Sequence, residues 1–200
     1  MLGVLFGLAW VALAINPRYR QDWALENALS VAFVAALVFF RGRLPLSRIS
    51  YTAIFLFLSL HTIGAHYTYS EVPYDEWSRA LTGQSLSGLF GWERNHYDRL
   101  VHFSYGFLLA YPIRQILIEV AGVRGAWCYY LPFAVTSSSS ADYELLEWGA
   151  ATVFGGDLGM AYLGTQGDVW DAQKDMALAA LGALLSMGLT AIRTTWRRED

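Results

Sequence analysis

The stretch GDVWDAQKDM at residues 167–176 runs directly into the apolar segment ALAALGALLSMGLTAI at residues 177–192. Asp168, Asp171 and Asp175 are spaced by three and four residues, so a helix that begins near Asp168 carries all three carboxylates on one face. The apolar segment approaches the ~20 residues that cross a hydrocarbon core. Carboxylates at the end of such a membrane segment are energetically unfavourable unless a cation or a hydrogen-bond donor faces them. The stretch therefore predicts a membrane helix with a polar partner at one end.

The composition of the whole chain favours a membrane protein. Apolar residues make up 55% of its 200 residues and charged residues only 16%, and the mean hydropathy is +0.32. The net charge of -3 and the lack of a long basic run exclude a nucleic-acid-binding protein. A single cysteine, Cys128, excludes an internal disulfide and a cysteine-based zinc cluster.

Six apolar segments, each bounded by Arg, Pro, Gly or Asp, are expected to be membrane helices. They are long and rich in Leu and Ala, and hydrocarbon admits only helices or closed barrels. The sequence therefore predicts an all-α fold: a polytopic membrane helical bundle that forms one integral-membrane domain over residues 1–200. The expected segments are 2–16, 23–40, 48–67, 97–118, 126–150 and 171–193.

Two connecting regions need separate interpretations. Residues 68–96 are expected to lie outside the membrane and are long enough to act as a lid. Residues 2–16 are interpreted as a first span because they lack a basic flank and a convincing cleavage site. A cleaved signal peptide is the alternative for that segment.

The basic residues predict the orientation of the bundle. Eight of the fourteen Lys and Arg residues lie in, or beside, the 40s connection, the 119–125 connection and the C-terminal tail. Because basic residues gather on the cytoplasmic side, we expect these regions and both termini to be cytoplasmic. The eight are Arg41, Arg43, Arg48, Arg114, Arg124, Arg193, Arg197 and Arg198.

Four polar clusters then fall at the opposite, outer face. Each stands at the outer end of one predicted span, and a step of three or four residues lowers a side chain by roughly 5–6 Å along a helix. We expect an upper layer of Asp98, Glu147 and Asp171, and a lower layer of His102, Glu144 and Asp175, with His66 or His61 beside it. The clusters are HTIGAHYTYSEVP (61–73), NHYDRLVHFSYG (95–106), ADYELLEWGA (141–150) and GTQGDVWDAQKD (164–175).

These layers predict a divalent metal site, because several charges near hydrocarbon need a cation to compensate them. Carboxylates and histidines one turn apart on several helices are how helical bundles build metal cages. Histidine ligation favours zinc, manganese or iron, and ligation by oxygens alone favours magnesium or calcium. The expected ligands are His66, His102, Glu144, Asp171 and Asp175.

A purely structural interpretation competes with the metal site at several positions. Asp168 before an apolar run is an N-cap candidate, and His61 alone fits a hydrogen-bonded core residue better than a ligand. Arg94 and Arg99 could supply part of the compensating positive charge, and Arg99 is expected to pair with Asp98 or a nearby carboxylate rather than to act in catalysis.

Two further features near the outer face have a structural and a functional interpretation. Four tryptophans are expected to form an interfacial belt rather than a substrate cage. The segment YLGTQGD (162–168) is expected to be a tight turn, with an oxyanion cradle as the alternative. The tryptophans are Trp77, Trp92, Trp148 and Trp170.

Four motifs carry a resemblance to a known family. The chain resembles the YjdF-like family of predicted bacterial inner-membrane proteins through GAHYTYSEVP, NHYDRLVHFSYGF, YELLEWGAA and LGTQGDVWDAQKDM. The resemblance covers about residues 50–190 and only loosely the first two spans, and SSSSADYE is more polar than the family pattern. It implies a multi-pass helical protein of the bacterial inner membrane and supplies no activity, cofactor or catalytic residue.

The leading functional hypothesis is a metal-dependent hydrolase or transferase that acts on a lipid or other amphiphile. A metal held by His102, Glu144 and Asp175 would activate water and polarise a carbonyl or phosphoryl oxygen. Asp98 or Glu147 would then act as general base. One alternative is a small transporter or a cation- or proton-binding membrane protein. The other is a structural bundle in which the cluster fixes helix registry.

Overall fold

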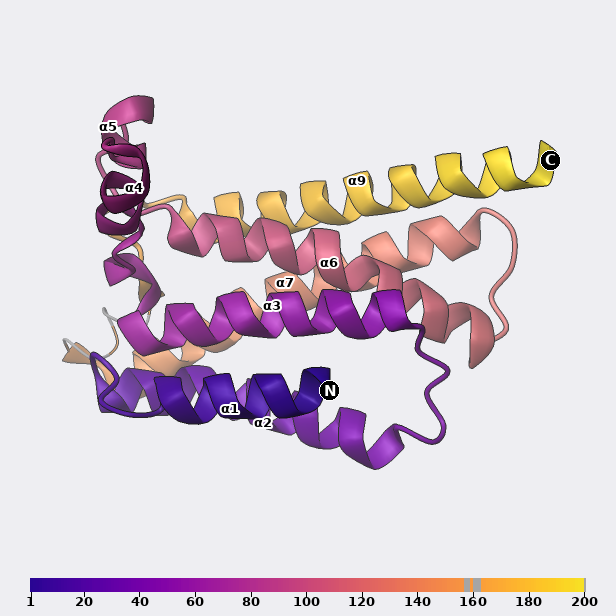
Figure 1. Ribbon diagram of the computed structural model, residues 1–200, viewed down its shortest axis with the longest axis horizontal. Coiled ribbons are helices and arrows are strands. Elements are labelled where there is room, and N and C mark those ends of the chain that lie inside the picture. The colour runs from indigo at the N-terminus through magenta and orange to yellow at the C-terminus, as the bar shows by residue number, and fades with distance from the viewer. Residues whose placement is uncertain (157–158, 160–162, 200) are drawn as a thin grey trace.

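The computed structural model describes residues 1–156, 159 and 163–199, with side chains described as far as residue 194. Throughout these residues the fold is helical, without strands. Six principal helices run side by side and alternate in direction along the chain (Figure 1). The expected all-α bundle is confirmed. The six are α1 (Leu2–Leu13), α2 (Arg20–Phe40), α3 (Arg48–Tyr67), α6 (Tyr97–Glu119), α7 (Trp127–Phe154) and α9 (Asp171–Glu199).

Each predicted segment corresponds to one of these helices, with ends that differ by a few residues. Among the described residues, α2, α3 and the part of α9 at Asp171–Thr194 are long and apolar enough to cross a membrane. Helices α6 and α7 have 23 and 28 residues but carry more polar side chains. Helix α1 has 12 residues, fewer than the ~20 of an average span. A polytopic protein is therefore established, and six crossings stay a prediction.

The connections gather at two opposite ends of the bundle (Figure 1). Residues 41–47 and 120–126 lie at the same end as the end of α9, as expected for the arginine-rich set. Residues 14–19 and 68–96 lie at the other end, which is called the outer end below. Assignment of the arginine-rich end to the cytoplasm stays a prediction.

The 68–96 connection is folded rather than extended. It holds the short helices η1 (Tyr69–Glu71), α4 (Tyr74–Thr82) and α5 (Leu86–Phe90), and α4 and α5 lie at one side of the outer end, where they project beyond the start of α9 (Figure 1). Gly83 and Gly91 end these helices at positive φ, a conformation that glycine adopts without strain. The carboxylate of Asp75 accepts a hydrogen bond from the Ser87 amide and joins α4 to α5. A lid function for this pair stays a prediction.

The position of the polar cluster is set by an unusually close contact between α6 and α9. A Cβ atom added at Gly106 would lie 1.9 Å from the Ala179 carbonyl oxygen, and one added at Gly182 would lie 2.3 Å from the Phe103 carbonyl oxygen. Small residues let membrane helices approach in this way. Both helices begin at the outer end (Figure 1). The residues one turn before the contact, His102 and Asp175, therefore lie at the same level.

Helix α6 is the central helix and also packs against α3 and α7. Ile54 and Leu58 of α3 form an apolar cluster with Leu109 of α6, towards the inner end. Apolar side chains thus fill the middle of the bundle, and the inner end holds a separate polar contact in which the Ser50 hydroxyl donates to Gln115 Oε1. The ionisable cluster lies in the outer half.

Candidate functional site

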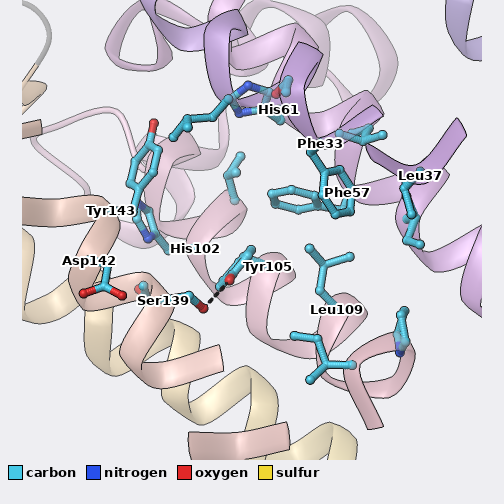
Figure 2. A pocket seen from close by; sticks show the side chains of 18 of the residues that line it. Phe33, Leu37, Phe57, His61, His102, Tyr105, Leu109, Ser139, Asp142 and Tyr143 are labelled. Atoms are coloured by element: carbon cyan, nitrogen blue, oxygen red, sulfur yellow. Dashed lines mark hydrogen bonds between the residues drawn. The ribbon is translucent and has the colours of Figure 1, made fainter. Parts of the chain in front are cut away.

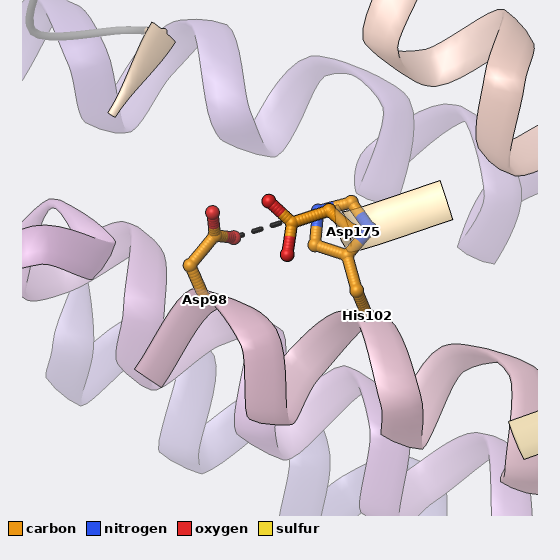
Figure 3. A group of neighbouring side chains, drawn as sticks. All are labelled: Asp98, His102 and Asp175. Atoms are coloured by element: carbon orange, nitrogen blue, oxygen red, sulfur yellow. Dashed lines mark ion pairs between the residues drawn. The ribbon is translucent and has the colours of Figure 1, made fainter. Parts of the chain in front are cut away.

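Three ionisable side chains from α6 and α9 converge in the outer half of the bundle (Figure 3). One possible ligand atom from each of Asp98, His102 and Asp175 lies within 4.8 Å of the other two. His102 Nε2 is 3.5 Å from Asp98 Oδ1, one turn earlier on α6. Asp175 is only 2% exposed and His102 9%. The two predicted layers are therefore not separate here, because Asp98 meets His102 and Asp175 directly.

Helix α7 adds a third carboxylate to this group. His102 Nε2 is 3.6 Å from Glu144 Oε1. Glu144 Oε1 and Asp175 Oδ1 are both buried without a hydrogen-bond partner. Buried carboxylate oxygens without a donor are strongly unfavourable. We call Asp98, His102, Glu144 and Asp175 the carboxylate–histidine cluster.

The predicted ligand Asp171 lies in a different environment from the cluster. It is 4% exposed and pairs with Arg94 Nη1 and, at 3.3 Å, with Arg99 Nη2. Arg99 Nη2 also lies 2.5 Å from Asp168 Oδ2. The prediction that Arg99 pairs with a nearby carboxylate is confirmed, although its partners are Asp168 and Asp171 rather than Asp98. Within the described residues, no Lys or Arg side chain lies within 4 Å of a carboxylate of the cluster.

Asp168 does not act as an N-cap, which corrects the sequence interpretation. Helix α9 begins at Asp171, and Asp168 Oδ1 accepts from the Trp170 amide before the first helical residue. Its other oxygen accepts from Lys174 Nζ at 2.6 Å. The hydrogen bonds from Lys174 and the Trp170 amide hold the pKa of the Asp168 carboxyl well below its usual range. Asp168 and Asp171 are contacted by three cations, Arg94, Arg99 and Lys174. These ion pairs hold the Asp168 side chain away from the capping position.

The segment before α9 is a tight turn, with positive φ at Gly164, Gln166 and Gly167. The carbonyl oxygens of Gly164 and Thr165 accept hydrogen bonds from Arg94. Carbonyl groups face the site here, so the turn binds a guanidinium and not an oxyanion. Tyr162, at the start of the quoted YLGTQGD segment, lies outside the described residues.

A reciprocal pair of hydrogen bonds lies beside this turn. The backbone amide of Asn95 donates to Gln166 Oε1 at 2.9 Å, and Gln166 Nε2 donates to the backbone carbonyl of Asn95 at 3.1 Å. This pair joins the segment before α6 to the turn before α9.

The two histidines of α3 do not join the cluster. His61 is 7% exposed, its Nε2 lies 3.1 Å from the Glu26 carbonyl, and its Nδ1 bonds to the Tyr69 hydroxyl. The prediction of a hydrogen-bonded core histidine is confirmed. His66 Nδ1 lies 2.7 Å from the Leu13 carbonyl and ties α3 to α1. The structure therefore does not bring the predicted ligand His66 to Asp98, His102 and Asp175.

Helix α2 contributes two buried carboxylates that the sequence reasoning missed. Asp22 is 3% exposed and Glu26 7%. Asp22 Oδ2 accepts from Thr68 Oγ1 at 3.0 Å, and Glu26 Oε2 accepts from the Tyr143 hydroxyl at 3.1 Å. Their four-residue spacing at the outer end of a span is the same signal that marked Asp171 and Asp175. Asp22 lies just before the predicted segment 23–40, whereas helix α2 begins at Arg20 and includes it.

Glu147, the other predicted general base, lies above the cluster. It lines a small cavity of about 20 Å³ that is also lined by Asp98 and Glu26. The structure therefore brings both predicted bases, Asp98 and Glu147, to one polar space at the outer end.

A much larger cavity of about 350 Å³ begins at the cluster. Asp98 and His102 line its outer part, and Leu109 and Ile116 line its inner part. Figure 2 shows Phe33 and Phe57 facing the cavity, and Tyr105 hydrogen-bonded to Ser139 on its wall. The Tyr105 and Ser139 oxygens are 2.6 Å apart. Beyond this pair the lining of the inner part is almost entirely apolar.

The four tryptophans predicted to form a belt are exposed. Their exposed fractions run from 36% at Trp92 to 63% at Trp148. Trp77 belongs to α4 and Trp170 directly precedes α9, so both lie towards the outer end. These positions agree with an interfacial belt.

Comparison with known proteins places the chain among membrane proteins. The family described as predicted membrane protein (DUF2238) matches residues 1–196. The inner membrane protein YjdF of Escherichia coli (strain K12) is 36% identical over 181 residues, which are 90% of this chain and 82% of that protein. No solved structure matches the chain. The match includes the first two helices, where the four motifs showed only a loose resemblance.

Proposed function

This chain belongs to the DUF2238 family of predicted membrane proteins, and from the geometry of its polar cluster we propose that it is a metal-dependent hydrolase or transferase that acts on a lipid or another amphiphile. Its similarity to an inner membrane protein of Escherichia coli supports a place in the bacterial inner membrane. The proposed site is the carboxylate–histidine cluster at the outer end of the bundle.

One observation carries the proposal: two buried carboxylate oxygens, Glu144 Oε1 and Asp175 Oδ1, lack a hydrogen-bond donor beside His102. Buried charges are retained when they are paired or bind a metal. The neighbouring cations are bound to Asp168 and Asp171 instead. A divalent cation would supply the missing compensation.

The geometry is compatible with such an ion after small side-chain movements. Tetrahedral zinc ligands, at ~2.1 Å from the metal, lie about 3.4 Å apart. His102 Nε2 is already 3.5 Å from Asp98 and 3.6 Å from Glu144. The ligand atoms of Asp98, His102 and Asp175 lie within 4.8 Å of one another, so a movement of up to about 1.4 Å would bring them to this spacing. Glu144 lies outside this group of three and would have to approach Asp98 and Asp175.

These positions refine the expected roles. Asp98, His102, Glu144 and Asp175 would hold the ion, and one nitrogen with several oxygens suits zinc, manganese or iron. When bound, the ion would lower the pKa of a coordinated water and polarise a carbonyl or phosphoryl oxygen. Glu147, in the small cavity beside Asp98, would accept the proton of the attacking water. His66 and Asp171 have other partners and are not included.

The inner half of the bundle favours an enzyme over a transporter. A transporter needs polar groups that lead from the site to the opposite face. The cavity instead continues inward past Leu109, Ile113 and Ile116. An ion at the cluster would therefore exchange only with the solution on the outer side of the membrane.

Metal analysis of the purified protein tests the proposal. After incubation with zinc, manganese or iron and removal of free metal, we expect about one ion per chain and a melting temperature that falls with a chelator. Asp175→Asn should bind much less metal and lose the chelator response. Glu119→Gln, which removes one carboxylate charge at an exposed residue of the inner end of α6, should behave like the wild type.

A wild-type protein that binds none of these ions, and whose melting temperature ignores both metal and chelator, would rule the proposal out. If the cluster only fixes helix registry, Asp175→Asn removes a buried charge and should be neutral or stabilising.

A further inference from the structure

We infer that the 350 Å³ cavity binds the hydrocarbon chain of a single-chain lipid, which enters sideways from the bilayer between α2 and α7. The polar end of this lipid lies at Asp98 and His102. Its role as a substrate rests on the proposed function, whereas its binding in the cavity does not.

The shape of the cavity fits one chain. Its lining on α6 extends from Asp98 to Ile116, and 18 residues of helix cover about 27 Å. This length approaches the ~30 Å thickness of a hydrocarbon core. A volume of about 350 Å³ spread over such a length makes a narrow slot. One extended hydrocarbon chain fits it, and the paired chains of a phospholipid do not.

The slot is open to the bilayer along one side. Leu29 and Phe33 of α2 and Leu146 of α7 line it, yet they are 48%, 37% and 55% exposed. Side chains that both line a cavity and face the surrounding lipid mark an opening. Helix α2 packs against α3, and the Tyr143–Glu26 hydrogen bond joins α2 to α7 at the outer end. A chain can therefore enter below this bond.

The polarity of the slot orients its occupant. Asp98 and His102 belong both to the slot and to the cluster. The Tyr105 and Ser139 hydroxyls come next, and Leu109, Pro112 and Ile116 line the inner part. A lipid with its polar end at the outer level and its chain directed inward matches this gradient, and the reverse orientation would bury the polar end among apolar side chains.

Photo-crosslinking with a mid-chain diazirine derivative of hexadecanol tests the inference. This neutral probe avoids repulsion by the carboxylates, so its binding does not depend on a metal. The protein is placed in nanodiscs made of diacyl phosphatidylcholine alone, and crosslinked peptides are mapped by mass spectrometry. We expect crosslinks at slot residues such as Leu109 and Ile113 to exceed those at Leu184 and Leu189, which are exposed on α9.

Two variants sharpen the test. Leu109→Trp fills the slot, and displacing two methylenes from it should lower slot crosslinking roughly tenfold or more. Leu184→Trp makes the same change on the lipid-facing side of α9 and should leave slot crosslinking unaltered. If Leu109→Trp does not fold, the wild-type crosslink map still decides the question. Crosslinks spread evenly over lipid-facing positions would overturn the inference. An absence of slot crosslinks in these nanodiscs would also overturn it, because diacyl lipid would then occupy the slot.

The same probe separates this inference from the proposed function. Slot crosslinking that persists in Asp175→Asn and with a chelator, in a protein that binds no metal, would retain the lipid site and reject the metal enzyme. Metal binding without slot crosslinking would do the opposite.

Discussion

The close contact between α6 and α9 gives the sharpest stability prediction. In Gly106→Ala the new methyl group would lie 1.9 Å from the Ala179 carbonyl oxygen, whereas ordinary contacts begin at 3.4 Å. The two helices would have to separate by about 1.5 Å, because the atom that the methyl group meets is backbone and cannot rotate away.

The magnitude follows from two opposing terms. Overpacking of a tight contact costs about 1–3 kcal/mol, and a backbone obstacle places this case at the upper end. The gain in helix propensity from glycine to alanine returns about 1 kcal/mol. We therefore expect a net loss of about 2 kcal/mol in the free energy of unfolding.

Unfolding in a sodium dodecyl sulfate titration, followed by circular dichroism, measures this loss. Gly188→Ala is the matched control on α9, because a Cβ there meets no atom within 4 Å, and it should be neutral or slightly stabilising. If Gly106→Ala unfolds at the same midpoint as Gly188→Ala, the described contact between α6 and α9 is wrong. The separation also draws Asp175 away from His102, so Gly106→Ala should bind less metal if the proposed site is real.

Three further predictions concern the outer end. Arg94→Gln leaves the buried Asp171 carboxylate with only its longer contact to Arg99 and should lower the free energy of unfolding by about 3 kcal/mol, the lower end of the range for a broken buried pair; adding Asp171→Asn should recover much of this loss, and no recovery would argue against the pairing. Since the pKa of Asp168 is lowered in the folded protein, its contribution to stability is complete above about pH 5 and is lost as the pH falls through the folded-state value. Thermal melting of Asp168→Asn should therefore depend less on pH below about 4 than melting of the wild type, and identical acid profiles would contradict this assignment. Reporter fusions after Arg43 and Arg124 should be cytoplasmic and a fusion at Ser87 should be outside, whereas a cytoplasmic signal at Ser87 would reverse the orientation.

Much of the fold could be predicted from the sequence because membrane helices are determined locally. Long apolar segments need no knowledge of their neighbours, and all six correspond to helices. Depth along a helix was predictable in part. His102 and Asp175 lie at one level, as their spacing from the helix ends indicated, but Asp98, expected one layer higher, meets them directly.

The pairing of side chains at one level could not be predicted in this way. Asp171 and Asp175 are both aspartates, one turn apart at the start of the same apolar helix. Yet Asp171 is paired with Arg94, while Asp175 Oδ1 has no hydrogen-bond partner. The difference depends on the turn at Gly164 and Thr165, whose carbonyls hold Arg94 beside Asp171. The lipid slot was equally hidden, because it arises between helices that are distant in sequence.

The reciprocal pair of hydrogen bonds between Asn95 and Gln166 has a consequence for how often the outer end is open. The segment preceding α6 can leave the turn preceding α9 only when both of these hydrogen bonds, and the two from Arg94 to the Gly164 and Thr165 carbonyls, break together. At about 1 kcal/mol for each bond, this opening costs about 4 kcal/mol. The outer end is then open in only about 0.1% of molecules at any moment. A molecule that reaches the cluster therefore comes more readily from the bilayer, between α2 and α7, than through the outer end.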